Sequence, residues 1–190
     1  MSQTKRHRLY AVLLILIPLL TVTLLFMIVG VAPFGPKNLL ISDLSTQYLQ
    51  FFAELRRQLL NLSFSSYSFL ISIGDSLIPI YAYYLLSPLN LIVVFFSPAK
   101  LPIAIDLIIW AKMILCCISM SSFLTLKYRR YDFMAICGGL AYGLCGFVSM
   151  YFYDLMWLDA LIILPMLVYG LEKLYNQNKM SLYVLCLALT

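Results

Sequence analysis

Asp43 is the residue of this chain whose type and position best suit catalysis. It is one of eight acidic residues in a chain of 190, and it follows a long apolar stretch at the start of an amphipathic pattern. A carboxylate held where lipid head groups meet water can act as a general base and take a proton from a hydroxyl group. Aspartate is also a favoured N-cap of helices. Position alone favours the cap, and one residue can fill both roles.

Two arginines later in the same amphipathic pattern are candidates for binding phosphate. Arg56 and Arg57 carry guanidinium groups, which present a fork of donors to phosphate oxygens. The competing interpretation is that both side chains extend toward anionic lipid head groups, as arginine commonly does on an interfacial helix. The pattern by itself favours this second interpretation.

Further charges lie in or between the later apolar stretches. Asp154 and Asp159 flank a short segment predicted to lie on the same side of the membrane as Asp43. A second carboxylate there could position a substrate or assist a cation, or the turn could be polar only because it touches water. Lys112 lies inside an apolar stretch, where a charge needs a partner. We expect it to form a structural ion pair or to contact a lipid phosphate.

The composition indicates a polytopic membrane protein. Apolar residues make up 63% of the chain and charged residues only 11%, which lies outside the range of soluble domains. The net charge of +5 comes from short basic clusters between apolar stretches, so it predicts membrane topology and no nucleic-acid partner. The five cysteines fall inside apolar stretches, which favours neither a disulfide framework nor a zinc site.

The first part of the chain predicts one span and a long outward loop. Basic residues in the tail 1–8 place the N-terminus in the cytoplasm, and residues 9–31 form the first span. Residues 32–100 are then outside. Within them, 43–60 form an amphipathic helix that suits the head-group plane, and 77–96 form an apolar stretch broken at a proline.

The basic clusters decide whether residues 77–96 cross the membrane. If they are interfacial or re-entrant, all short basic clusters lie on the cytoplasmic side, as the positive-inside rule expects. The later spans are then predicted at 101–126, 133–153 and 158–171, and a fifth span begins at 180–190. Because the last apolar run is too short to cross a bilayer, we expect the chain to be an N-terminal fragment.

Several motifs from residue 41 onward resemble one protein family. They are Ser42-Asp43 with Gln47-Tyr48, Tyr67-Ser68-Phe69 with Gly74, the run Tyr81-Ala82-Tyr83-Tyr84-Leu85-Leu86-Ser87-Pro88-Leu89-Asn90-Leu91, and Met156-Trp157-Leu158-Asp159-Ala160-Leu161 with Leu164-Pro165. Together they resemble the YfhO family of bacterial membrane proteins.

The resemblance implies an all-α polytopic membrane protein with a helical bundle like that of GT-C glycosyltransferases. Such enzymes carry the active site in the first outward loop, with interfacial helices. The implied reaction takes a sugar from a polyprenyl-phosphate donor in the bacterial plasma membrane and attaches it to a cell-envelope polymer such as lipoteichoic acid. The resemblance also implies that the fragment alone is inactive, because GT-C enzymes have more spans.

Six residues are assigned roles in the expected reaction, from the resemblance or, for the two arginines, from the chemistry of guanidinium groups. Asp43 would be the catalytic base, and the candidate substrate-binding residues are Asp159, Arg56, Arg57, Gln47 and Tyr48. No metal ligand and no cofactor is predicted. The Asp-x-Asp or Asp-Glu motif of some GT-C relatives is missing, because Leu44 and Ser45 follow Asp43. The sequence does not decide whether the reaction needs a divalent cation.

Two other classes of function fit part of the sequence. A transporter or flippase for lipid-linked precursors would use the basic groups and Lys112 along a path through the membrane. A non-catalytic membrane assembly factor would need no chemistry at all. The gathering of acidic residues on one predicted face favours the enzyme over the transporter.

Overall fold

The computed structural model describes residues 3–71 and 73–189, with side chains from residue 5 onward. Residues 1, 2 and 190, at the ends of the predicted tail and of the last predicted span, lie outside this part. The chain divides into two compact units. Unit 1 contains Met1–Leu25, Lys112–Tyr151 and Trp157–Thr190, and unit 2 contains Phe26–Ala111 and Phe152–Met156.

Long apolar helices dominate the described residues. Four of them are long and apolar enough to cross a membrane: Lys5–Val29, Pro98–Tyr128, Phe133–Tyr151 and Leu155–Gln177. A bent pair of shorter helices raises the number to five if the pair counts as one span. The prediction of an all-α polytopic membrane protein is confirmed.

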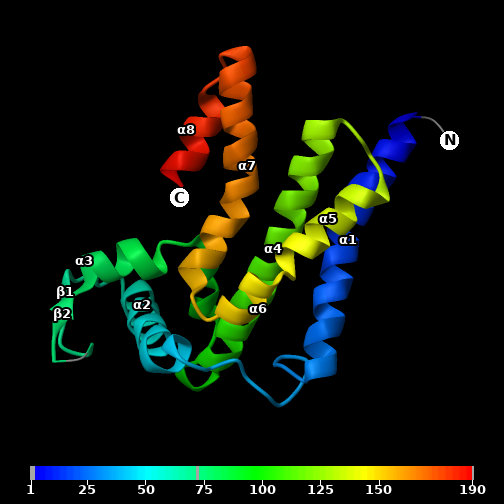
Figure 1. Ribbon diagram of the computed structural model, residues 1–190. Coiled ribbons are helices and arrows are strands. Elements are labelled where there is room, and N and C mark those ends of the chain that lie inside the picture. Colours follow the sequence, from blue (N-terminus) through cyan, green and yellow to red (C-terminus); the bar gives the residue numbers. More distant parts are fainter. Residues whose placement is uncertain (1–2, 72, 190) are drawn as a thin grey trace. The chain divides into compact units, whose positions relative to one another are not determined.

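Unit 1 is built from long and short helices (Figure 1). Its elements are most of α1 (Gln3–Val29), the second part of α4 (Leu101–Tyr128), α5 (Phe133–Gly143), α6 (Gly146–Tyr151), nearly all of α7 (Leu155–Gln177), and α8 (Ser181–Ala188). Figure 1 shows α8 folding back along α7, and a Cβ atom added to Gly170 of α7 would lie 2.8 Å from the backbone nitrogen of Tyr183. This close approach needs a residue without a side chain.

The stretch predicted as one helix over 133–153 is divided in the structure. α5 ends at Gly143 and α6 begins at Gly146, with a turn at residues 144–145. Glycine is a poor helix former, so interrupting the helix between these two glycines costs little free energy. Phe133–Tyr151 still qualifies as one candidate span.

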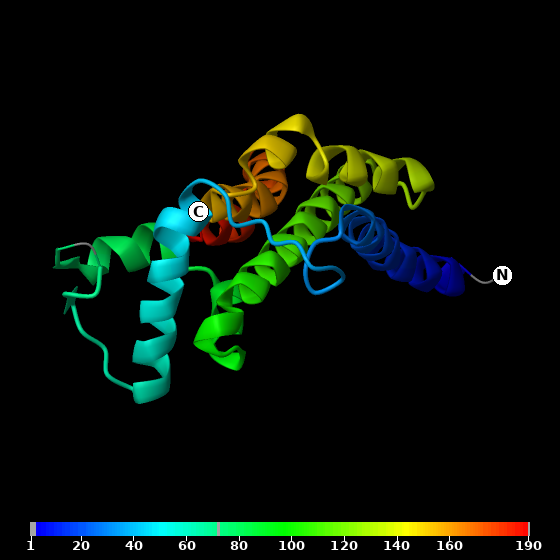
Figure 2. The same ribbon diagram turned by 90° about the horizontal axis from the view of Figure 1, so that it is seen from below.

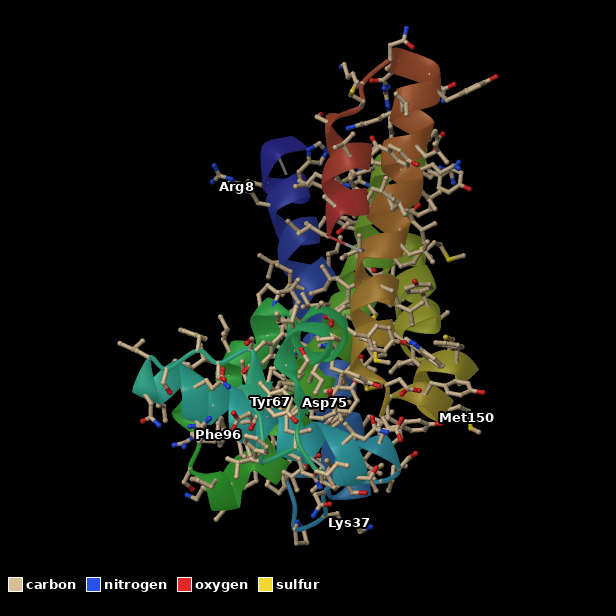
Figure 3. The ribbon with its side chains drawn as sticks, turned by 90° about the vertical axis from the view of Figure 1, so that its left-hand side faces the viewer. Arg8, Lys37, Tyr67, Asp75, Phe96 and Met150 are labelled. Carbon is tan, nitrogen blue, oxygen red and sulfur yellow. The ribbon has the colours of Figure 1, made fainter. Side chains whose placement is uncertain are left out.

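Unit 2 holds the shorter elements of the chain. They are η1, a π-helical turn (Leu44–Tyr48), α2 (Leu49–Asn61), β1 (Tyr67–Ser68), β2 (Asp75–Ser76), α3 (Leu77–Ile80), the π-helical turn η2 (Tyr81–Leu85), and the 3₁₀ segments η3 (Pro88–Phe95) and η4 (Pro98–Lys100). β1 and β2 form a small antiparallel hairpin, in which Ser68 pairs with Asp75; Tyr67 and Asp75 are labelled in Figure 3. From the hairpin the chain enters α3, whose continuation η2 packs against α2 (Figure 2).

The apolar stripe of the amphipathic helix contacts protein. Phe51, Phe52 and Leu55 are buried, and α2 packs against η2 and η3. The stripe is thus covered by protein, and the position of the helix in the head-group plane stays a prediction. An amphipathic pattern shows only that one face is buried, because lipid and protein select the same spacing of apolar residues.

The apolar stretch 77–96 turns sharply near its middle. Leu77–Leu85 and Pro88–Phe95 meet at 104°. Ser87 has extended backbone (φ −103°, ψ 132°), as a residue before proline prefers. Each half is shorter than the about 20 residues that a spanning helix needs. That the stretch does not cross the membrane stays a prediction.

Candidate functional site

The turn before Asp43 leaves its carboxylate free of a capping role. Ser42 has a left-handed backbone (φ +47°). The amides that an N-cap side chain would satisfy already donate to backbone carbonyls: Leu44 to Ile41 (3.1 Å), and Ser45 and Thr46 to Ser42 (3.2 Å each). Asp43 makes no side-chain cap hydrogen bond. The N-cap interpretation is therefore wrong.

The loop that leads to this turn is tied to α4. Asp106 of α4 is fully buried, and its Oδ1 accepts a hydrogen bond from the backbone amide of Leu39 at 3.0 Å. Its Oδ2 has no hydrogen-bond partner within the described residues. Asp106 thus holds the loop four residues before Asp43.

Asp154 is the carboxylate that belongs to the same unit as Asp43. It lies in the Phe152–Met156 segment of unit 2 and is only 7% exposed. Burial raises the pKa of the Asp154 carboxyl, and the negative charge of Asp43 raises it further. The two carboxylates are therefore close enough to repel each other. Neither forms an ion pair or hydrogen bond through its side chain in the described part of the chain.

Two tyrosines lie within electrostatic range of this pair: the charge of Asp154 acts on Tyr48, and the charges of both carboxylates act on Tyr84. The buried Tyr48 hydroxyl donates to Met156 Sδ at 2.6 Å, and burial raises the pKa of Tyr48. The Tyr84 ring meets the Tyr48 ring edge-on, with centroids 5.4 Å apart. Three of the motifs that carry the family resemblance thus meet here, since Tyr48, Tyr84 and Met156 come from different ones. Tyr84 had no predicted role.

Gln47 lies one helical turn after Asp43. Its side chain is partly exposed and makes no hydrogen bond to the described residues. An amide in this position offers both donors and an acceptor to a polar ligand.

The two arginines are engaged within the fold. Arg57 Nε and Nη2 donate to the two carboxylate oxygens of Glu54 at 2.8 and 2.7 Å, which lowers the pKa of Glu54. Glu54 also accepts from Gln58 (2.8 Å), whose Oε1 accepts from the Tyr81 hydroxyl (2.6 Å). Arg56 Nε donates to the carbonyl of Phe96, which is labelled in Figure 3.

Helix length separates these arginines from Asp43. η1 and α2 continue without a break in helical backbone, so the 13 positions from Asp43 to Arg56 correspond to roughly 20 Å along the axis. An arginine side chain cannot bridge that distance. The structure does not bring Arg56 or Arg57 to the carboxylate pair.

Asp159 has a different partner from the one its motif suggested. In unit 1, Lys112 Nζ donates to Asp159 Oδ2 at 2.6 Å. Lys112 is completely buried, whereas the Asp159 side chain is 29% exposed. Of the two alternatives for Lys112, an ion pair or a contact to lipid phosphate, the structure shows the ion pair, and its partner is the candidate substrate-binding residue Asp159.

The carboxylate pair has the chemistry of proton transfer. One carboxylate, Asp43, is partly open to solvent, and the other, Asp154, is held in a buried aromatic setting that favours its protonated form. No group of three or more His, Cys, Asp or Glu side chains that could hold a metal ion occurs among the described residues.

Comparison with known proteins gives a family match. The family model described as "Bacterial membrane protein YfhO" matches residues 14–190. Neither the curated proteins nor the solved structures give a match to the chain.

Proposed function

Because the chain belongs to the YfhO family of bacterial membrane proteins, we propose that it is a GT-C-type membrane glycosyltransferase. It takes a sugar from a polyprenyl-phosphate donor and transfers it to a cell-envelope polymer such as lipoteichoic acid. The site lies on the outer face of the plasma membrane. The proposal rests mainly on the Asp43 carboxylate, which has no hydrogen-bond or ion-pair partner within the described residues and lies within electrostatic range of a second carboxylate.

In the proposed reaction Asp43 is the general base. A hydroxyl oxygen of the acceptor forms a bond to the anomeric carbon of the sugar, and the bond from that carbon to the donor phosphate breaks. The electron pair of the broken bond stays on the phosphate, and the hydroxyl proton passes to Asp43. Glycosyl transfer has oxocarbenium character, so even a weakly basic carboxylate can assist it.

Asp154 would complement Asp43 by holding a proton. Its raised pKa keeps it protonated to a higher pH than an ordinary aspartate. A protonated carboxyl group can donate a hydrogen bond to a sugar or acceptor oxygen while the neighbouring carboxylate accepts one.

The other candidate residues fall into two groups. Gln47 is placed to bind a sugar hydroxyl, and Tyr48 forms part of the aromatic wall. Arg56, Arg57 and Asp159 are used in contacts within the protein, so we assign the donor phosphate to none of them.

Sugar transfer by the protein in its native membranes tests the proposal. The donor would be a radiolabelled polyprenyl-phosphate sugar, and the measurement is label in the envelope polymer. We expect Asp43→Asn to lower the rate by about 10²–10⁴-fold, the usual contribution of general acid–base catalysis. Asp75→Asn is the matched control, because Asp75 is an exposed carboxylate in the same predicted outward loop.

Two outcomes would remove the proposal. Normal polymer glycosylation by Asp43→Asn would exclude this residue as the base. Movement of labelled lipid between leaflets by the purified protein, without sugar transfer, would favour the transporter.

A further inference from the structure

A basic cavity in unit 1 has no part in the proposed reaction. Its volume is about 390 Å³. It lies between the start of α1 and the turn from α4 to α5, two segments far apart in the sequence. Its lining consists of Arg6, His7, Arg129, Arg130, Tyr131 and Asp132.

Ring contacts fix the two segments around this cavity. The His7 ring stacks on Tyr131 with centroids 4.2 Å apart, and Tyr10 meets Tyr131 edge-on at 5.6 Å. The Tyr10 hydroxyl shares a hydrogen bond of 2.6 Å with Thr125 Oγ1 of α4. Arg129 has a left-handed backbone (φ +51°) and follows the end of α4, so the chain turns there.

Basic side chains outnumber acidic ones in the lining of this cavity. Three arginines and one aspartate line it, and that aspartate, Asp132, already accepts from the Ala135 amide as the N-cap of α5. The side chains of Arg6, Arg129 and Arg130 form no ion pair within the described residues. Guanidinium groups that line one cavity offer paired donors that match the oxygens of phosphate.

An apolar cavity adjoins the basic one. Arg130 and Asp132 also border a second cavity of about 510 Å³, whose lining includes Leu124, Met134 and Ala135. Both cavities lie where α4 ends and α5 begins, at the ends of two candidate spans. A ligand that fills both needs a phosphate head and a hydrocarbon chain.

We propose that the two cavities bind one anionic phospholipid of the inner leaflet. Its phosphate lies among Arg6, Arg129 and Arg130, and an acyl chain extends along Leu124 and Met134. Basic residues at span ends commonly serve only to orient a protein in the membrane. Orientation needs charge alone, whereas this site needs side chains from two segments around one hollow. Arg8 illustrates the difference: it lies next in the same basic run but does not line the cavity and points outward from α1 (Figure 3).

Lipid binding by the purified full-length protein tests this site. Native mass spectrometry would compare phosphatidylglycerol, which is anionic, with zwitterionic phosphatidylcholine. We expect the double variant Arg6→Gln/Arg130→Gln to lose tenfold or more in affinity for phosphatidylglycerol. The control Arg8→Gln/Lys179→Gln removes the same charge from the same predicted side without touching the cavity, and we expect a change of less than twofold.

A second variant tests the acyl-chain cavity. Met134 is 75% exposed, so Met134→Gln places a neutral polar group in the apolar cavity without burying it in the protein. We expect it to weaken phosphatidylglycerol binding and to leave binding of inorganic phosphate unchanged. Thermal melting of every variant shows that the fold is retained.

Three results would overturn the proposal. Equal losses in the two double variants would mean that only surface charge matters. Equal binding of the two lipids by the unchanged protein would remove the anion requirement. Inorganic phosphate that binds as tightly as phosphatidylglycerol would assign the site to free phosphate. None of these readouts depends on sugar transfer, so failure of the lipid site and failure of the proposed function can be told apart.

Discussion

At the scale of single residues, the notable feature is a pair of carboxyl groups that form no ion pair with a cation among the described residues. Asp43 and Asp154 repel each other enough to raise the pKa of Asp154, which is already raised by burial. Such an arrangement costs folding free energy, since the charged form of a buried carboxyl is disfavoured. Glu54, by contrast, is buried with Arg57 and Gln58 as partners. The unbalanced pair is the one expected of a site selected for activity.

The cost of this pair predicts a pH-dependent gain in stability for Asp154→Asn. The pKa of Asp154 is raised above 3.8 in the folded protein, so the folded state binds more protons than the unfolded state above that pH. The stability this group contributes is therefore complete below 3.8 and is lost as the pH rises through the raised pKa. We expect Asp154→Asn to melt at a higher temperature than the unchanged protein at about pH 7, with a smaller difference in acid.

Asp75→Asn serves as the comparison for this measurement, because Asp75 is exposed. Thermal melting in detergent at several pH values would show the difference. An Asp154→Asn variant that is less stable than the unchanged protein at neutral pH would mean that the carboxylate has a stabilising partner. In that case the Asp154 carboxylate does not destabilise the fold, and its burial no longer indicates a functional site.

At the scale of elements, α4 organises the contacts of unit 1 through small and polar residues. Gly139 and Gly143 of α5 let its backbone approach α4, where the neighbouring groups are Cys117 and Ser121. Gly146 lies seven residues after Gly139, a spacing that on one continuous helix would predict the same seam. The structure excludes it, because nothing lies within 4 Å of a Cβ added to Gly146. The turn between α5 and α6 takes Gly146 out of the helical register.

This packing predicts different effects on stability for the same substitution, glycine to alanine, at three positions. A Cβ at Gly143 would lie 2.8 Å from the backbone nitrogen of Cys117, and one at Gly139 would meet the Cys117 carbonyl and the Ser121 side chain. Because the backbone of α4 cannot move aside cheaply, we expect Gly139→Ala or Gly143→Ala to cost about 1–3 kcal/mol. Gly146→Ala should be neutral or slightly stabilising. Thermal melting measures all three, and similar values for Gly139→Ala and Gly146→Ala would contradict the close packing of α5 on α4.

At the scale of the whole molecule, the proposed chemistry depends on which side of the membrane each segment occupies. Lys37 lies in the loop after α1, and its side chain is exposed (labelled in Figure 3). Tyr128 lies at the end of α4 and is 61% exposed. The basic clusters predict that the first position is outside and the second inside, provided that residues 77–96 do not cross the membrane.

Labelling with a membrane-impermeant maleimide tests this topology. Single cysteines would be placed by Lys37→Cys and Tyr128→Cys in a background without the five native cysteines. We expect residue 37 to react in intact cells and residue 128 only after permeabilisation. Reaction of residue 128 in intact cells would show that 77–96 crosses. If residue 37 reacted only after permeabilisation, Asp43 would lie on the cytoplasmic side, and the proposed reaction at the outer face would be excluded.

The sequence by itself determined the class of the protein and the residue on which its proposed function centres. Membrane-spanning helices are recognisable because about 20 consecutive apolar residues are a local property of the chain. Asp43 is recognisable because charges are rare in such a chain, and the family follows from motifs that the residues spell out directly.

Only the tertiary structure decided which side chains are partners. It removed the capping role of Asp43, paired Asp159 with Lys112, bound Arg57 to Glu54, and placed Asp154 beside Asp43. It also turned the apolar stripe of α2 toward η2 and η3. These outcomes depend on contacts between segments far apart in the chain, and on which group becomes the hydrogen-bond or ion-pair partner of each amide or charge. Local spacing predicts neither, because the same pattern of charged or apolar residues suits contact with water, with lipid or with a distant part of the fold.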